Sequence, residues 1–345
     1  MAIYALGQRS GETYDAAGKA ISDVYHILGE FDAKVIWNMP KKCNKYLKIL
    51  DIPYLTFFLL GKVGSNDYIF FSIPENGFKI KLIKKLQKIK KYQIVCFVND
   101  INAFRYGNFE AEEVQTRMRE EISLIGVADK VIAPNKNTIK LFEKFGIDSQ
   151  MFPVGVWGYL VDEDTCHRIQ ENAEKKFDSK IKIAFAGNLN KSEFLWNLDE
   201  NDNIEFELWG KLDTNRKPLP KQCHYHGVLP SEKVPEAISF CDYGLVWDGT
   251  GKNEIAGGLG EYLRYNNSHK CGLYLASQLP VIVWEESGMA DFVRENQCGI
   301  TIKNLQELSQ KVGETGSFNK EMLEKIGTNI RKGTYLHRVF EKVFK

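Results

Sequence analysis

Short apolar runs of strand length alternate with longer amphipathic stretches along the first half of the chain. The runs rich in β-branched or aromatic side chains, as strands are, lie at 1–7, 34–39, 67–74, 93–100 and 129–134. Helical patterns separate them at 13–28, 78–91, 109–127 and 135–146. Strands that alternate with helices in this way predict a parallel sheet that is covered by helices on both faces.

The same alternation begins again in the second half of the chain. Its strand-like runs lie at 180–189, 204–212, 224–229, 243–249, 280–284 and 298–302. Two successive arrays predict an α/β protein with two Rossmann-like domains facing a cleft, which is the usual ligand site of such folds. We place the first domain at 1–156 and the second at 157–333. The final helix, 334–345, is a candidate to cross back and pack on the first domain.

Composition narrows the class of protein further. The 345 residues are 43% hydrophobic and 26% charged, which is ordinary for a globular protein of two domains. A net charge of +1 gives no global attraction to nucleic acid or membranes. The N-terminal residues lack a signal-peptide pattern, and the most apolar window, 52–61, has about half the length of a membrane span. Seven cysteines without a CxxC pair predict a reduced, cytoplasmic protein.

A Ser-His-Lys triplet, Ser268 to Lys270, opens a predicted short helix directly before the strand at 280–284. The N–H groups of a helix N-terminus attract anions, and a lysine beside them completes a phosphate site. Ser268 has the chemistry of an N-cap, and Lys270 would then face the cleft. The alternative is a capped helix whose lysine is only solvated.

A second candidate for phosphate binding follows the first strand of the second array. An apolar strand runs into Gly187 and Asn188, and Lys191 follows in a polar turn. Glycine lets the backbone approach a ligand closely, and the lysine supplies positive charge. The pattern favours a turn that accepts a phosphate or a sugar, although glycine and asparagine also suit a plain βα turn.

A glycine-rich segment of about twenty residues follows the strand at 243–249, and it is longer than a simple connection needs. It has neither Walker A spacing nor a dinucleotide-binding fingerprint. Asp248, at the end of the strand, is a candidate to accept a hydrogen bond from a ribose or sugar hydroxyl. It would serve equally well to cap the turn.

The first domain offers a carboxylate at the end of its strand 93–98. Asn99, Asp100 and Arg105 follow this strand, where they would face the cleft. Three interpretations of Asp100 stay open. It is a general base that takes a proton from a hydroxyl, a metal ligand together with Asn102, or a helix cap.

Three other features carry less weight. His224 and His226 alternate on one predicted strand, but no third ligand is evident, so we expect no metal site. The acidic run 162–164 precedes a helix, and helix capping explains it. The helix at 79–91 carries seven lysines beside an apolar stripe. This is typical of the solvated face of a sheet-covering helix, and the minority interpretation is contact with an anionic membrane.

Several of these segments together resemble one family of bacterial GT-B glycosyltransferases. The segment 266–284, followed by 286–293 and 298–302, is similar to the donor-domain signature of that family. The other landmarks of the family are matched, in the expected order, by 97–105, 128–147 and 184–192. The family includes UDP-galactofuranosyltransferases and the glucosyltransferases that extend N-acetylglucosamine on serine-rich-repeat adhesins.

The resemblance implies transfer of a hexose, galactofuranose or glucose, from a UDP-sugar to a glycan, glycoprotein or lipid-linked acceptor. UDP would be held mainly by the second domain, and neither a metal ion nor a cofactor would be needed. Lys270 would hold the diphosphate, with Lys191 near it. The same donor-binding motif includes Asn267, Ser268 and His269, and the loop that ends at Asn267 would read the sugar.

The resemblance also implies the stereochemistry of transfer. Retaining GT-B enzymes usually carry a Glu-x7-Glu pair before the strand that corresponds to 280–284, and here Leu273 stands where that pair would need a glutamate. This favours inversion, which needs a base on the opposite face of the sugar, and Asp100 is the candidate. Asn99 stands where relatives often carry histidine before the aspartate.

On the acceptor side, Gly11 and Thr13 lie in the loop after the first strand. They are positioned to close over the donor or to hold the acceptor, and the plain alternative for Thr13 is an N-cap. The resemblance hints at a homo-oligomer, and the helix at 79–91 would suit work at the inner face of the membrane. The rival functions are a catalytically silent glycosyltransferase-like subunit and a UDP-sugar epimerase.

Overall fold

A computed structural model describes residues 1–7, 16–36, 50–105, 109–174, 180–213, 215–248, 251–253, 255, 257–314 and 318–345. The chain divides into two compact units. Unit 1 comprises Met1–Gly11, Val24–Val154 and Leu336–Lys345, and unit 2 comprises Glu12–Asp23 and Gly155–Tyr335. In the part of the chain that is described, no helix combines the length and the apolar character that a membrane crossing requires.

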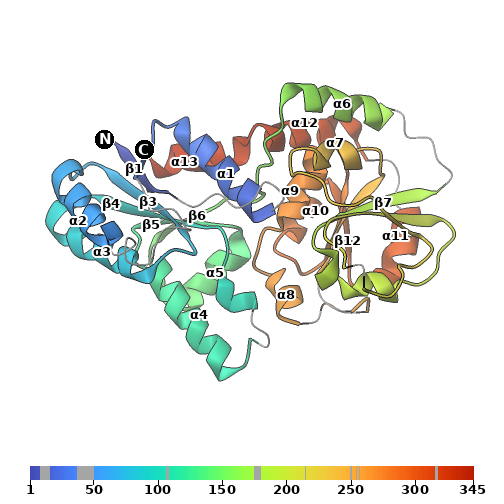
Figure 1. Cartoon of the computed structure of the whole chain (residues 1–345), viewed down its shortest axis with the longest axis horizontal. Helices are drawn as coiled ribbons and strands as arrows, with labels where there is room; N and C mark the ends of the chain where they lie inside the picture. The colour runs from blue at the N-terminus through green and yellow to red at the C-terminus, as the bar shows by residue number, and fades with distance from the viewer. Residues whose placement is uncertain are drawn as a thin grey trace. The chain divides into compact units, whose positions relative to one another are not determined.

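Unit 1 is built on a parallel sheet of six strands in the order β2-β1-β3-β4-β5-β6 (Figure 1). The strands are β1 (Ile3–Leu6), β2 (Lys34–Ile36), β3 (Tyr68–Ile73), β4 (Gln93–Val98), β5 (Lys130–Ala133) and β6 (Gln150–Pro153). The helices between them in sequence are α1 (Ala16–Gly29), α2 (Asp51–Lys62), α3 (Gly77–Lys90), the 3-10 helix η2 (Asn102–Arg105), α4 (Glu112–Ile125) and α5 (Lys136–Lys144). The residues of α1 up to Asp23 belong to unit 2. The two central strands, β3 and β4, are buried almost throughout, as the continuous apolar runs of a parallel sheet should be.

Unit 2 repeats this plan with the strand order β12-β11-β10-β7-β8-β9. Its strands are β7 (Ile181–Ala186), β8 (Ile204–Trp209), β9 (Cys223–Tyr225), β10 (Tyr243–Val246), β11 (Val281–Trp284) and β12 (Gly299–Ile302). Its α-helices are α6 (Glu163–Glu174), α7 (Val234–Ile238), α8 (Gly257–Tyr262), α9 (His269–Ala276), α10 (Ala290–Asn296), α11 (Leu308–Glu314) and α12 (Lys320–Arg331). Three 3-10 helices complete it, η3 (Leu189–Lys191), η4 (Glu193–Asn197) and η5 (Leu305–Glu307). The predicted α/β class with two Rossmann-like domains is therefore confirmed.

The order of the strands locates the point in each sheet where a ligand is expected. Counted from its own first strand, β7, unit 2 has the order 3-2-1-4-5-6 that dinucleotide-binding folds share. The direction of winding reverses between β7 and β10, which are neighbours. In unit 1 it reverses between β1 and β3. Ligands of such sheets bind outside the carboxyl ends of the strands at this switch point.

Two elements of unit 1 were not predicted. Helix α2 occupies the apolar window that the sequence analysis compared with a membrane span, and its exposed face is apolar, so the window shows no amphipathic period. Strand β6 lies near the end of the predicted first domain, after the last strand-like run at 129–134. It is only four residues long and is not fully buried, so its pattern is weak.

The last ten residues of the chain belong to unit 1. They include most of α13 (Thr334–Val343), whose Phe340 packs against Phe31 and Phe70 with ring centroids 5.7 and 5.9 Å away. The Tyr68 hydroxyl donates to the Lys345 carbonyl at 3.2 Å. Lys130 also hydrogen-bonds the backbone of this helix. The C-terminus of the chain therefore completes the core of the unit that contains its N-terminus.

Candidate functional site

The switch point of unit 2 brings together a lysine and a carboxylate. Lys270 is the second residue of α9, and Asp248 follows β10 shortly after that strand ends. The Lys270 Nζ lies 3.1 and 3.2 Å from the two carboxylate oxygens of Asp248. It also lies 5.1 Å from the centre of the Phe185 ring. Because both charged side chains are partly exposed, the pair is open to an incoming ligand.

Gly187, directly after β7, is where the backbone approaches Lys270. A Cβ at Gly187 would lie 3.1 Å from the Lys270 Cε, so glycine leaves room for the lysine. On the other side, the Gly187 N–H donates to the Trp209 carbonyl at 2.9 Å. A Cβ at Gly210, which has a φ of +131°, would lie 1.7 Å from the Gly187 carbonyl oxygen. Two glycines therefore let the turn fit between the end of β8 and the lysine.

Helix α9 presents its N-terminus at the same edge of the sheet. Its residues from Cys271 to Ala276 are all buried, so it is apolar on every side. A Cβ at Gly272 would lie 2.6 Å from the Trp157 carbonyl oxygen. The Ala186 N–H donates to the Tyr274 hydroxyl at 2.9 Å, and this hydrogen bond ties α9 to the end of β7. The position of the first turn of α9 is thus fixed by close packing.

Ser268 occupies the N-cap position of α9, but its side chain makes no capping hydrogen bond. The expectation that it would cap the helix is therefore wrong, although its backbone has the extended geometry of an N-cap (φ −60°, ψ 124°). The N–H groups at the start of α9 are not taken up by that hydroxyl and suit an anion. Asn267 and Ser268 are both buried, so they shape the start of the helix and do not project from it.

His269 lies in different surroundings from Lys270. Its ring packs against Tyr159 with centroids 5.0 Å apart, and its Nε2 is buried without a hydrogen-bond partner. Burial, with a smaller contribution from the positive charge of Lys19, lowers the pKa of His269 to about 3. The imidazole is therefore neutral at pH 7 and packs as an aromatic ring. Its assignment to donor binding stays a prediction.

Lys191 ends the turn η3 and is exposed. Asn188 accepts a hydrogen bond from the Asn190 N–H at 3.1 Å, so it shapes this turn, which is the plain role that the sequence left open. The Arg216 guanidinium donates to the Leu189 carbonyl at 3.3 Å and joins a second loop to the same turn.

A pocket of about 290 Å³ lies where these two loops meet, and it is lined by Glu193, Trp196, Asn197, Arg216 and Lys217. The Arg216 guanidinium stacks 4.3 Å from the Trp196 ring centre. The pocket was not predicted from the sequence, because the two loops that line it share no motif. Either loop alone reads as an ordinary polar connection.

In unit 1, Asn99 and Asp100 follow β4 directly. Both of their N–H groups donate to the Ile73 carbonyl, at 3.3 and 3.4 Å, which keeps the chain close to the end of β3. The first two N–H groups of η2 donate to the Glu121 carboxylate at 3.1 and 2.9 Å. The need for a capping carboxylate at η2 is thus met by Glu121, which the sequence analysis did not single out.

The remaining acceptor-side candidates are placed only in part. The backbone of Arg105 ends η2, but its side chain lies outside the described part of the structure. Gly11 and Thr13 lie outside the described residues altogether. The acceptor-side role of all three stays a prediction.

Two features that the sequence analysis discounted have different outcomes. Asp162 accepts hydrogen bonds from the Thr165 N–H and hydroxyl, at 2.9 and 2.8 Å, and these bonds hold the pKa of Asp162 below its ordinary value. The capping interpretation of the acidic run is confirmed. The expectation that His224 has no further ligand beside it is wrong, because Glu205 and Glu207 lie close to its ring.

Two family models match the chain, and together they extend over most of its length. The model of the N-terminal domain of glucosyltransferase 3-like proteins matches residues 8–156. The model of the C-terminal domain of the same proteins matches residues 183–343. They follow one another in the order of the domains they describe.

Curated relatives and solved structures agree with these models. The β-1,6-galactofuranosyltransferase WbbI of Escherichia coli (strain K12) is 27% identical over 349 residues, which cover 99% of this chain and 98% of WbbI. Glucosyltransferase 3 of Streptococcus parasanguinis is 26% identical over 300 residues, or 83% of this chain and 82% of the relative. The structure of Anabaena HepE in complex with UDP-glucose has the same fold, with a TM-score of 0.52 at 14% identity over 99% of both chains. The chain therefore belongs to the glucosyltransferase 3-like family of glycosyltransferases, whose fold is GT-B.

Proposed function

We propose that the protein is an inverting glycosyltransferase that moves a hexose from a UDP-sugar to a hydroxyl group of a glycan acceptor. The hexose would be galactofuranose or glucose, the sugars for which WbbI and glucosyltransferase 3 are named. The acceptor would belong to a surface polysaccharide or a glycoprotein. The observation that supports this best is the Lys270–Asp248 pair at the N-terminus of α9 and at the switch point of unit 2.

In this proposal the donor diphosphate binds beside the first turn of α9. The Lys270 ammonium exchanges its contact with Asp248 for a phosphate oxygen, and the N–H groups of the helix add further donors. Gly187 lets the backbone approach the phosphate, and Lys191 adds charge nearby. Asp248 is then left to accept a hydrogen bond from a hydroxyl of the ribose or the sugar. The protein supplies the positive charge itself, so no metal ion is needed at the diphosphate.

Inversion requires the acceptor oxygen to attack the anomeric carbon from the face opposite to UDP. Asp100 takes the proton of the acceptor hydroxyl as its oxygen forms the new bond to that carbon. The bond from the carbon to the phosphate oxygen breaks, and UDP leaves with the electron pair. Lys270 and the N-terminus of α9 stabilise the charge that develops on the phosphate. The base role for Asp100 is supported by its position, because it follows the end of β4 at the carboxyl edge of the unit 1 sheet.

A thermal-shift titration with UDP, GDP and CMP, each in the presence of EDTA, tests the donor assignment. UDP should raise Tm, because a ligand that binds only the native state stabilises it, and the other nucleotides should raise it less. The UDP-induced shift should shrink in Lys270→Ala. It should be retained in Lys84→Ala, which removes a lysine of unit 1 that pairs with Asp129 instead. No shift with any nucleotide would overturn the assignment and favour a catalytically silent subunit.

We infer further that unit 1 meets its acceptor at an anionic membrane surface, such as the inner face of the membrane. Helix α3 exposes Lys81, Lys85 and Lys88 at helical spacing, and Phe78 on the same face is 80% exposed. No ion pair of these three lysines occurs among the described residues. Each lysine near an anionic surface contributes about 1 kcal/mol to binding.

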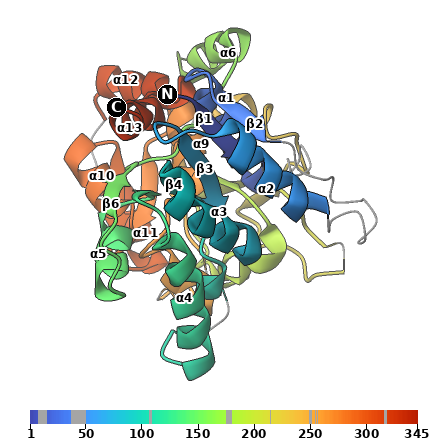
Figure 2. The ribbon, with the colours of Figure 1, turned by 90° about the vertical axis from the view of Figure 1, so that its left-hand side faces the viewer.

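The neighbouring helix α2 adds an apolar strip to this surface. It exposes Tyr54, Phe57 and Leu60, one helical turn apart, and Phe57 is 76% exposed. The two helices lie side by side (Figure 2), joined by a Lys79–Asp51 ion pair of 3.4 Å. Exposed aromatic rings on one helix and exposed lysines on the helix beside it are what interfacial membrane binding requires.

Sedimentation with vesicles tests the membrane surface. Vesicles that contain phosphatidylglycerol should bind the protein at low salt, and neutral phosphatidylcholine vesicles should not. Reversing the charge of Lys81, Lys85 and Lys88 to glutamate should abolish this binding. The matched control reverses the three lysines of α5, Lys136, Lys140 and Lys144, which changes the net charge equally. If both triple variants lost vesicle binding equally, the binding would depend on net charge alone, and α3 would not be the membrane-binding surface.

Two further expectations separate the proposal from its rivals. An epimerase would convert the UDP-sugar without releasing UDP, so UDP release that depends on an acceptor glycan supports transfer and excludes epimerisation. Self-association stays a prediction that sedimentation velocity tests. A single species of the monomer mass at assay concentration would refute it.

A further inference from the structure

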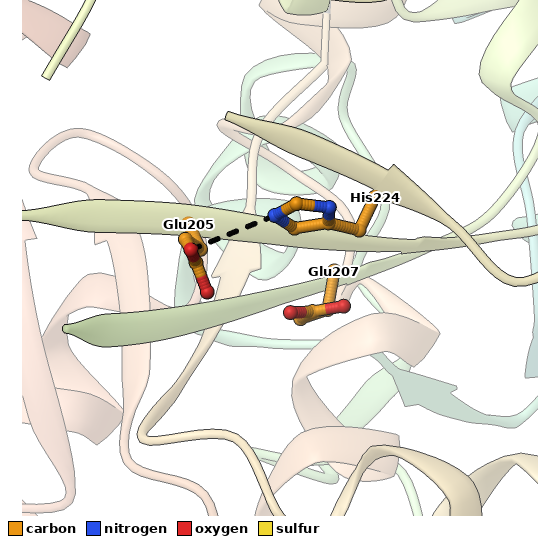
Figure 3. A group of neighbouring side chains, drawn as sticks. All are labelled: Glu205, Glu207 and His224. Carbon is orange, nitrogen blue, oxygen red and sulfur yellow. Dashed lines mark ion pairs between the residues drawn. The ribbon is translucent and has the colours of Figure 1, made fainter. Parts of the chain in front are cut away.

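Acidic and histidine side chains gather on one face of the strands β8 and β9. Glu205 and Glu207 project from β8, and His224 projects from β9 (Figure 3). One possible ligand atom of each side chain lies within 4.8 Å of those of the other two. Within the described part of the chain, this is the one group of three such side chains close enough to share a metal ion.

The backbone explains why these three side chains meet. Side chains two residues apart on a strand point to the same face, so Glu205 and Glu207 share one face of β8. The register of the parallel pair sets Glu207 beside His224. Strand β9 is the last strand of its sheet. The arrangement therefore depends on strand pairing and not on loops.

The ligand atoms match the preferences of zinc. Zn²⁺ takes carboxylate oxygens and imidazole nitrogens, and three protein ligands with a water complete a tetrahedron. Bonds of about 2.0 to 2.1 Å set the ligand atoms of a tetrahedron about 3.4 Å apart. The His224 Nε2 already lies 3.7 Å from a Glu205 oxygen. Small side-chain rotations therefore suffice to bring three ligands onto one ion.

Neighbouring groups hold the two carboxylates in place, as they do in established metal sites. Glu207 is hydrogen-bonded to the His226 ring, which stacks on Trp209 with centroids 4.6 Å apart. The Lys180 ammonium donates to Glu205 at 3.0 Å. The Glu207 side chain is only 7% exposed, whereas that of His224 is 45% exposed. An ion and its water would therefore enter from the side of His224.

The alternative is a set of ordinary ion pairs, and His337 of unit 1 shows what such a set looks like. His337 lies 3.6 Å from Glu30 and 3.9 Å from Glu341, and all three side chains are well exposed. In unit 2, by contrast, a nearly buried carboxylate lies close to a second carboxylate. Two like charges at such spacing repel each other, and a cation shared by both carboxylates removes the repulsion that the Lys180 ammonium at Glu205 leaves.

We propose that Glu205, Glu207 and His224 bind one Zn²⁺ ion, which pins the edge strand β9 to β8. Strand β9 has only three residues, so a cross-link has a large effect there. Past the two strands, the Gly210 N–H donates to the Gly227 carbonyl at 2.8 Å, and Gly210 lies against the Gly187 turn. We assign the ion a role in holding the two strands together and none in transfer. The inference is therefore independent of the proposed reaction.

Isothermal titration of chelator-treated protein with ZnCl₂ tests this site. The parent protein should bind one equivalent of Zn²⁺, and its Tm should rise with the ion. His224→Ala and Glu205→Gln each remove a ligand from the surface and should weaken binding by about 100-fold or more. His226→Ala removes only a supporting hydrogen bond and should weaken binding by about 10- to 100-fold.

The matched control is Glu341→Gln, which removes a carboxylate beside His337 and should leave the Zn²⁺ affinity unchanged. All of these variants keep every cysteine, so binding to thiols contributes equally to each. Circular dichroism establishes that each variant is folded. The proposal is wrong if the parent binds no Zn²⁺, or if His224→Ala and Glu205→Gln bind it as tightly as the parent. UDP titrations in EDTA are read separately, so either result leaves the donor assignment untouched.

Discussion

The two sheets of this protein have the same number of parallel strands, but they present chemical groups at different places. Unit 2 sets Lys270, Asp248 and the Gly187 turn at its switch point, between β7 and β10. Unit 1 sets Asn99 and Asp100 after β4, one strand beyond its own switch point between β1 and β3. Sheets of this kind bind a nucleotide where the winding reverses, so unit 2 has the features of a donor-binding unit. Because Asp100 lies away from the switch point of unit 1, we propose that it serves the second substrate.

The largest expected effect comes from changing unit 1 alone. Asp100→Asn keeps the size of the side chain but cannot take a proton at neutral pH. We expect kcat to fall by about 10²- to 10⁴-fold. The dissociation constant of UDP, measured by isothermal titration, should not change. A weaker UDP affinity in this variant would show that Asp100 contacts the donor. The proposed division of the two substrates between the units would then be wrong.

The matching change in unit 2 should affect both quantities. Lys270→Ala removes the positive charge beside the leaving phosphate, so kcat should fall by about 10²- to 10³-fold and UDP should bind less tightly. Asp248→Asn keeps the lysine and should lose less activity. Single-turnover kinetics measure the chemical step directly. An unchanged kcat in Lys270→Ala would contradict the leaving-group role.

A third test concerns His269, the buried first residue of α9. The folded state holds the pKa of His269 at about 3, below its ordinary 6.5, so the unfolded chain binds a proton that the folded state excludes. The stability from this group is therefore complete above about pH 6.5 and is lost as the pH falls toward 3. Between pH 7 and pH 5 we expect it to lower the free energy of unfolding by about 2 kcal/mol.

Urea denaturation at the two pH values measures this loss. His269→Phe is the matched variant, because it keeps an aromatic ring against Tyr159 and gives up no hydrogen bond of the buried Nε2. Its stability should depend less on pH over the same interval. An equal loss in the variant and the parent would show that His269 is not the group responsible.

The smallest expected effect comes from adding a Cβ at Gly187, which tests how closely this turn packs against the Lys270 side chain. Gly187→Ala places a Cβ 3.1 Å from the Lys270 Cε, and the lysine must shift by a few tenths of an ångström. We expect UDP to bind about fivefold more weakly, which is roughly 1 kcal/mol. Gly61→Ala in unit 1, where a Cβ would meet nothing within 4 Å, is the control and should bind UDP normally. A UDP affinity as high as that of the parent would show that the turn accommodates a Cβ at position 187 without displacing Lys270.

The sequence pointed to Gly187, Asp248 and Lys270, which lie at the switch point of unit 2, but not to their contacts. Gly187, Asp248 and Lys270 each stand at the end of a strand or the start of a helix, and parallel strands end at a common edge. Which of them touch depends on the strand order, which no local pattern contains. The burial of His269 was equally hidden, because it results from the enclosure of α9 on every side.

The proposed zinc site also depends on strand pairing, which the sequence pattern does not contain. The alternation of Glu205 with Glu207 is visible within one strand, and so is that of His224 with His226. Their meeting is set by the register of β8 and β9, which pairs residues 17 positions apart, such as Glu207 and His224. Helix α2 was missed for another reason. Its outward face is apolar, so it lacks the contrast from which a helix is recognised.

The position of Phe340 in the core of unit 1 bears on how the protein is made. Most of unit 1 leaves the ribosome before unit 2, but the residues that close its core, 336–345, are translated only after unit 2. At about 5 to 20 residues per second, unit 1 stays incomplete while the whole of unit 2 is synthesised. A stop codon directly after Tyr335 would therefore spare unit 2 and leave the core of unit 1 open.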